Sequence, residues 1–241
     1  MKRIRPWGIV LVVTGLLAGT WPHVWGQDPQ PNRAEASITL PMLLQHIEAK
    51  ARSLKSLSGR FQQSKITRLL ARPMNSEGIF YWQPPGRFRW ELGRPTPLTL
   101  VAQGDTVLVH YVDLDRAHLY RHPSGDGLFG QIIGTAGDTD QFQRTYSMQI
   151  TSGLEAADRH WVQLQLEPRT NRQARTLKRI EVLIDPATWL PQKVVITEVS
   201  GDLTSIRLHD LIENAEIAES LFSVRPPEGV QTRQFMGKGR P

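Results

Sequence analysis

The stretch EGIFYWQPPGRFRWEL, residues 77–92, holds five aromatic residues, two arginines and a Pro-Pro-Gly sequence within sixteen positions. In a β-strand, successive side chains point to opposite faces of the sheet. The alternation therefore predicts an apolar inner face and a charged outer face. The inner residues are Phe88, Trp90 and Leu92, and the outer residues are Arg87, Arg89 and Glu91. Residues Pro84-Pro85-Gly86 predict a turn that pairs this strand with the one before it.

The same period of two continues from Ser58 to about Leu211. Segments such as WVQLQLEP (161–168) and RIEVLID (179–185) alternate apolar and polar side chains. Turn sequences separate the runs: Gln103-Gly104-Asp105, Pro123-Ser124-Gly125-Asp126, Asp185-Pro186 and Ser200-Gly201-Asp202. Many short strands in series predict a mainly β chain, arranged as an antiparallel sheet, sandwich or barrel with one dry face.

Three segments depart from the strand pattern. Apolar residues recur every three or four positions at Leu40, Leu43, Leu44, Ile47, Ala51 and Leu54, which predicts an amphipathic helix. Thr39 and Pro41 suit its beginning. A short apolar helix is expected within 126–134, and a helical turn at 218–222. These elements favour a curved sheet that is covered by helices.

The charge of +6 arises at the two ends of the chain. Residues 1–26 and 231–241 each carry three basic residues and no acid, whereas the body between them has 23 basic and 23 acidic residues. This balance argues against a nucleic-acid-binding face. The chain has no cysteine, which excludes disulfides, thiolate nucleophiles and Cys-ligated zinc.

The N-terminus predicts export from the cytoplasm. A basic start precedes an apolar stretch from Trp7 to Ala18, which is short for a membrane span and typical of a signal peptide. We expect a signal peptide at 1–26, with an uncleaved anchor as the alternative. A polar linker at 27–37, a folded domain at 38–230 and a basic flexible tail at 231–241 are expected to follow.

No motif for catalysis or cofactor binding stands out. His118 and His122 are four apart but lie in a strand-and-turn region, where a solvated pair is the better interpretation. The acidic pairs of DLD (113–115) and DTD (138–140) suit turns, and the basic run 169–179 suits a solvated hairpin loop. We therefore expect no metal, no cofactor and no enzymatic activity.

In order and spacing, several short motifs resemble the periplasmic outer-membrane lipoprotein carrier protein LolA family. They are Phe61-Gln62-Gln63, Gly78, Pro85, Phe88-Arg89-Trp90, the stretch from Val101 to Gly104, Tyr111, and ESLFSVRPPEGV at 219–230. The resemblance extends from about Leu40 to Val230. It implies an incomplete antiparallel barrel with helices as a lid, whose apolar cavity binds the acyl chains of lipoproteins.

The resemblance also implies partners and site residues. An inner-membrane transporter would load the carrier in the periplasm, and an outer-membrane receptor would unload it. The expected cavity residues are Phe80, Trp82, Phe88, Trp90, Leu98, Leu100 and Tyr111, and the expected lid residues are Leu128, Phe129, Ile132 and Ile133. Pro84 occupies the position at which the family has an arginine that latches the lid.

Other interpretations stay open at this point. The aromatic residues of 77–92 suit the core of a filled barrel as well as the lining of a cavity. A lipid- or lipoprotein-sensing domain, a carrier of another lipid, and a secreted enzyme are the alternative functions. We expect a monomer.

Overall fold

Helix α1, Leu40–Ser53, begins where its sequence predicts, although the side chain of Thr39 forms no capping hydrogen bond. The carbonyl oxygen of Thr39 accepts a hydrogen bond from the backbone N–H of Leu43 at 2.9 Å, and Pro41 lies in the first turn. Its apolar stripe packs on the sheet, with Leu43 fully buried. Among the helices that the structure describes, none is long and apolar enough to cross a bilayer.

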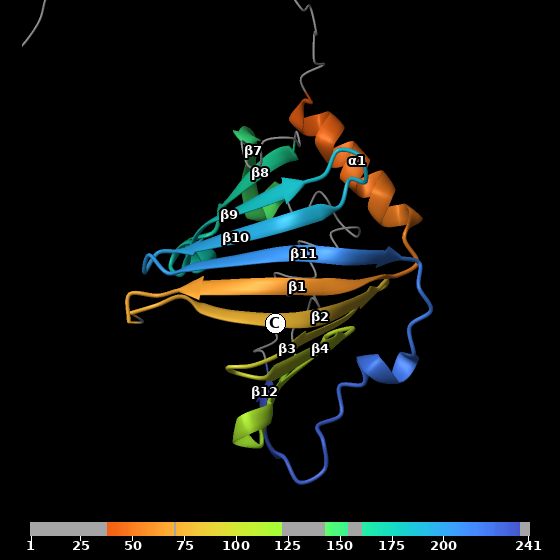
Figure 1. The fold of residues 1–241 in the computed structure, drawn as a ribbon, viewed down its shortest axis with the longest axis vertical. Coiled ribbons are helices and arrows are strands. Elements are labelled where there is room, and N and C mark those ends of the chain that lie inside the picture. The colour runs from red at the N-terminus through yellow and green to blue at the C-terminus, as the bar shows by residue number, and fades with distance from the viewer. Residues whose placement is uncertain (1–37, 70, 122–142, 154–160, 237–241) are drawn as a thin grey trace, which may run out of the picture. The chain divides into compact units, whose positions relative to one another are not determined.

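The structure is a computed structural model that describes residues 38–69, 71–121, 143–153 and 161–236. The chain divides into two units, 1–37 and 38–241, and all described residues belong to the second unit. Twelve strands of this unit form a single sheet (Figure 1). They are β1 (Leu57–Ile66), β2 (Met74–Gln83), β3 (Arg87–Leu92), β4 (Leu98–Gln103), β5 (Thr106–Tyr111), β6 (Arg116–Arg121), β7 (Tyr146–Gly153), β8 (Trp161–Pro168), β9 (Leu177–Ile184), β10 (Pro191–Glu198), β11 (Leu203–Glu213) and β12 (Gln231–Met236). Short helices are η1 (Val112–Leu114), α4 (Asn171–Ala174) and η2 (Glu219–Phe222).

The strand order is β12-β6-β5-β4-β3-β2-β1-β11-β10-β9-β8-β7. Because β12 and β7 are both edge strands, the curved sheet is open. This confirms the prediction of a mainly β, incomplete antiparallel barrel. One pair differs from that prediction, since β12 runs parallel to β6.

The predicted hairpin around Pro84 and its side-chain parity are confirmed. Phe88 lies opposite Trp82, and Trp90 lies opposite Phe80, on the face that α1 covers. We call this the inner face. Arg87 and Arg89 point to the opposite, outer face, where they contact η2.

The prediction of a flexible tail at 231–241 is wrong for its first six residues. Gln231–Met236 form β12, which pairs with β6 along its whole length. The backbone N–H of Gln231 donates to the carbonyl oxygen of Asp115 at 3.0 Å, and the ring of Phe235 stacks on Tyr120 at 4.9 Å. Without β12, the edge of β6 would expose unpaired backbone N–H and C=O groups. Either a parallel or an antiparallel strand can form hydrogen bonds with them.

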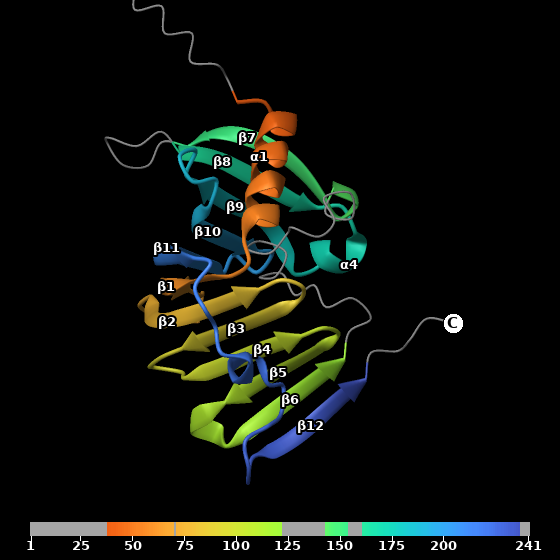
Figure 2. The same cartoon turned by 90° about the vertical axis from the view of Figure 1, so that its right-hand side faces the viewer.

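The segment between β11 and β12 is held on the outer face of the sheet (Figure 2). Arg87 forms an ion pair with Glu219 at 3.2 Å, and Arg89 donates to the carbonyl oxygen of Leu221 at 3.0 Å. Phe222 is fully buried. A second small core lies on this face, and its members are Val101, Leu108, Ala117, Leu119, Val224 and Val230.

Phe222→Ala is expected to lower the free energy of unfolding by about 3–5 kcal/mol, because it leaves a large cavity at a fully buried position. Glu219→Gln in the same turn serves as the control. Glu219 is 84% exposed, so losing its ion pair should cost less than about 1 kcal/mol. Denaturant unfolding of both variants checks the difference, and equal losses would contradict it.

Candidate functional site

The inner face is apolar across most of its width. From β1 to β3 it is lined by aromatic side chains, and from β7 to β11 mainly by aliphatic ones. The aliphatic members include Leu164, Leu166, Ile180, Val182, Val194, Ile206 and Leu208. This surface is continuous with the apolar stripe of α1, and together they form the main core.

Four of the predicted cavity residues lie inside this core. Phe80, Trp82, Phe88 and Trp90 are all less than 7% exposed. Phe61 stacks on Trp90, with ring centroids 3.5 Å apart and an interplanar angle of 17°. Their rings therefore largely pack against neighbouring protein groups.

The other three predicted residues lie further along the same face and are more accessible. Leu98, Leu100 and Tyr111 are half-buried, and the register of β3, β4 and β5 places them on the inner side. Tyr111 begins an aromatic group that continues to the sheet edge. Its other members are His118, Tyr120 and Phe235, and the ring of His118 meets Tyr111 and Phe235 edge-on.

His118 is thus half-buried among aromatic rings rather than part of a solvated pair. Its Nδ1 lies 3.2 Å from the hydroxyl oxygen of Tyr120. The second histidine of the spacing, His122, lies outside the described residues. Within the ranges that are described, no three His, Asp or Glu side chains are close enough to hold a metal ion.

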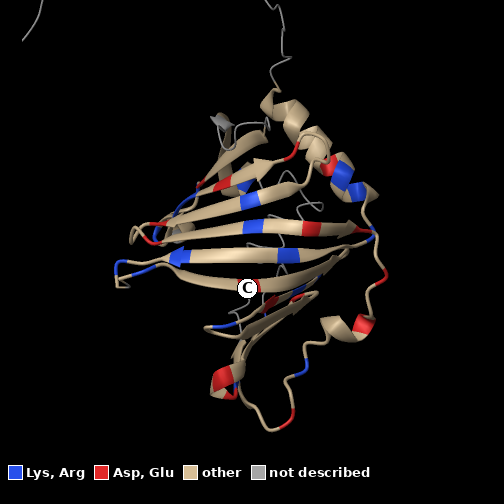
Figure 3. Ribbon diagram, viewed as in Figure 1, with Lys and Arg blue, Asp and Glu red and all other residues tan. Residues whose placement is uncertain are grey.

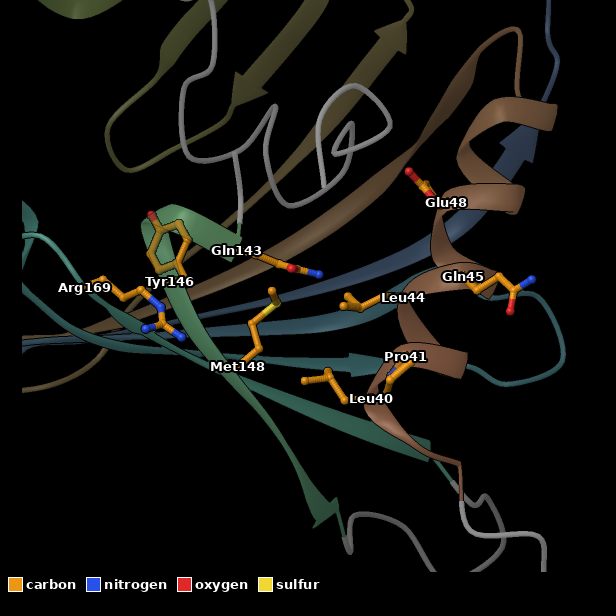
Figure 4. Close-up of a pocket in the computed structure, with 9 residues that line it drawn as sticks. All are labelled: Leu40, Pro41, Leu44, Gln45, Glu48, Gln143, Tyr146, Met148 and Arg169. Carbon is orange, nitrogen blue, oxygen red and sulfur yellow. The ribbon is translucent and has the colours of Figure 1, made fainter. Parts of the chain in front are cut away.

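A pocket of about 530 Å³ lies between helix α1 and strand β7 (Figure 4). Its lining residues are Leu40, Pro41, Leu44, Gln45, Glu48, Gln143, Tyr146, Met148 and Arg169. Its volume is in the range of about 300–1,000 Å³ that small-molecule sites occupy. Sequence reasoning missed this site, although the apolar stripe of α1 indicated that the helix covers an apolar surface.

The pocket has an apolar floor and a polar rim. Leu40, Leu44 and Met148 lie together in Figure 4, while Gln143 and Glu48 extend from opposite sides. Tyr146 is 1% exposed, and its hydroxyl oxygen accepts a hydrogen bond from Gln173 at 3.5 Å. Burial raises the pKa of the Tyr146 phenol, so the ring stays neutral in neutral solution. Such a site suits the hydrocarbon part of an amphipathic ligand.

The structure bears on the predicted latch but not on the predicted lid residues. The residues Leu128, Phe129, Ile132 and Ile133 lie outside the described residues. Pro84, which the sequence resemblance placed at the latch position, lies in the β2–β3 turn and has no side-chain donor. Arg87 and Arg89 do not replace that latch from the inner face, because both bind the η2 segment outside.

Comparison with known proteins gives one consistent result. The family model for outer membrane lipoprotein carrier protein LolA matches residues 52–225. An outer-membrane lipoprotein carrier protein of Alkalilimnicola ehrlichii is 28% identical over 213 residues, covering 86% of this chain and 89% of the relative. The protein of the same name from Legionella pneumophila (strain Corby) is 24% identical and covers 76% and 86%.

A solved structure supports the fold. The crystal structure of an uncharacterised conserved protein from Thermus thermophilus matches with a TM-score of 0.53 and 10% identity, over 81% of this chain and 98% of that one. At this identity the match concerns the fold alone.

Proposed function

Because this chain belongs to the LolA family of outer-membrane lipoprotein carriers, we propose that it binds the acyl chains of lipoproteins and carries them across the periplasm. The observation that carries the proposal is the pocket between α1 and β7, whose apolar side chains Leu40 and Met148 adjoin an inner face of aliphatic and aromatic residues. No chemical step is part of this function.

The physical requirement is to cover hydrocarbon during transit. Each methylene that is removed from water contributes about 0.8 kcal/mol, so a multiply acylated lipoprotein does not cross an aqueous space unaided. Leu44 and Met148 offer apolar surface on two elements that are not covalently adjacent, α1 and β7. Separation of these elements would enlarge the pocket for longer chains.

Loading and release are proposed to involve membrane partners. A transporter of the inner membrane would supply the cargo, and a receptor of the outer membrane would accept it. Since Pro84 supplies no latch and both nearby arginines are engaged on the outer face, release would not depend on an arginine inside the barrel. The cargo residues proposed beyond the pocket are Leu98, Leu100 and Tyr111.

The direct test is to purify the exported protein from the periplasm and identify bound molecules by mass spectrometry after organic extraction. We expect acylated lipoprotein to co-purify. Recovery of a free lipid in place of lipoprotein would support the alternative of a different lipid cargo, and repeated recovery of an empty protein would contradict the proposal.

Leu44→Asp is expected to reduce the affinity for an acyl probe at least tenfold, because a carboxylate in the apolar floor strongly disfavours hydrocarbon. The matched control is Met42→Asp, which adds the same charge to α1 at an exposed position, 44% accessible and outside the pocket lining. Displacement of a fluorescent fatty acyl probe measures both. Equal affinities in the two variants would remove the pocket from the proposed site.

A further inference from the structure

The turn between β1 and β2 presents an aliphatic side chain to solvent. Leu69 is 95% exposed, the largest value among the exposed large hydrophobic residues of the described ranges. Ile66, at the end of β1, is 47% exposed. A single exposed leucine is ordinary on a protein surface, so the significance of Leu69 depends on the residues around it.

Two neighbouring turns join this tip. The backbone N–H of Arg68 donates to Oδ1 of Asp202 in the β10–β11 turn at 3.4 Å, and that turn also exposes Val199 by 55%. The backbone N–H of Val199 in turn donates to the carbonyl oxygen of Thr176, in the β8–β9 turn, at 2.9 Å. We call these three connected turns, together with the strand residues next to them, the hairpin edge; it comprises residues 65–69, 71–73, 169–178 and 198–202.

The hairpin edge is strongly basic. Segments 65–73 and 169–178 carry seven basic residues and no acid, and segment 198–202 adds only Glu198 and Asp202. Figure 3 shows the basic colour at the β1–β2 tip. Four exposed side chains form no ion pair with any described residue: Arg68, Arg72, Arg175 and Lys178.

Exposed aliphatic side chains surrounded by cations without ion-pair partners are complementary to the surface of an anionic bilayer. Aliphatic side chains enter the boundary between headgroups and acyl chains, while Lys and Arg meet the lipid phosphates. A protein partner is a poorer match, because protein interfaces centre on a contiguous apolar core that is enriched in aromatic residues. The apolar side chains of the hairpin edge are instead separate tips.

We propose that the hairpin edge docks this protein on an anionic membrane surface, with Leu69 and Val199 inserted and Arg68, Arg72, Arg175 and Lys178 on the phosphates. This role rests on the proposed carrier function. The hairpin edge lies next to the proposed acyl-binding pocket. Arg169 belongs both to the β8–β9 turn and to the pocket lining, and Gln173 of the same turn donates to Tyr146 in the pocket. Docking would bring the pocket to the bilayer from which an acyl chain enters or into which it leaves.

The absence of cysteine allows a direct test with a single label. Leu69→Cys in the exported protein is labelled with an environment-sensitive fluorophore and mixed with vesicles of phosphatidylethanolamine and phosphatidylglycerol. We expect a blue shift and a severalfold rise in emission. The matched control is Ile212→Cys, an aliphatic position 57% exposed near the opposite end of β11, which should not respond.

Charge is tested by Arg68→Ser with Arg72→Ser, which should weaken vesicle binding about tenfold or more, since each basic residue near an anionic surface contributes a severalfold factor. Arg225→Ser with Arg233→Ser removes the same charge from exposed positions elsewhere and should have little effect. A label at position 69 that stays in water, or equal responses at positions 69 and 212, would overturn the proposal.

The same preparations separate this proposal from the proposed function. The fluorescent acyl probe is displaced from the unlabelled protein in the absence of vesicles. Normal probe binding without a vesicle response at position 69 contradicts membrane docking alone. A vesicle response in a protein that binds no acyl probe contradicts the carrier function and leaves the docking surface in place.

Discussion

Gly78→Ala is expected to lower the free energy of unfolding by at least about 3 kcal/mol, at the upper end of what overpacking costs. A Cβ at this position would lie well inside van der Waals contact with the ring of Phe61 and with the carbonyl oxygen of Glu91. Neither neighbour moves freely. Phe61 is fully buried and stacked on Trp90, and Glu91 lies within β3, paired with β2 and β4.

Gly104→Ala distinguishes this steric effect from the general cost of replacing glycine. Gly104 has a φ of 59° in the β4–β5 turn, and a Cβ there would meet nothing within 4 Å. Its replacement should cost only the backbone penalty of about 1–2 kcal/mol. Thermal and denaturant unfolding of both variants provides the comparison, and a Gly78 variant as stable as the Gly104 variant would show that the Phe61 ring relocates without cost.

The β2–β3 hairpin of this fold could be predicted from the sequence because the residues that define it are close together in the chain. The alternation in FRWEL assigned Phe88 and Trp90 to the inner face, and Pro84 marked the turn, as the register of β2 and β3 confirms. Long-range pairing was not accessible. Nothing in 231–236 indicates that this segment pairs with β6, because an edge strand is selected by an available partner rather than by its own pattern.

The candidate site was less accessible for a related reason. The alternation of apolar and polar residues shows which side chains share a face of the sheet. It does not show whether the space above that face is filled by other protein groups. Phe61 occupies the space over Trp90, whereas Leu98 and Tyr111 on the same face stay half-buried. The pocket depends on the contact between α1 and β7, two segments that are far apart in sequence.

Trp90→Ala is expected to lower the free energy of unfolding by about 3–5 kcal/mol, the usual cost of removing a large buried ring. Trp90 is 6% exposed, stacks on Phe61 at 3.5 Å, and lies 6.1 Å from the rings of both Phe80 and Phe88. Its removal would therefore take away a ring contact from each of these three aromatic side chains. Acyl binding is best measured at low temperature, where the variant stays folded.

The paired variant is Tyr111→Ser, which truncates a half-buried aromatic residue on the same inner face. Here we expect a stability loss below about 1.5 kcal/mol and a reduction in acyl affinity of about threefold to tenfold, since part of the apolar contact is lost on binding rather than on folding. Unfolding and acyl-probe displacement are measured on both variants. The opposite result, a stable Trp90 variant that no longer binds the probe, would mean that cargo displaces Phe61 and that the aromatic residues of 77–92 line the cavity after all.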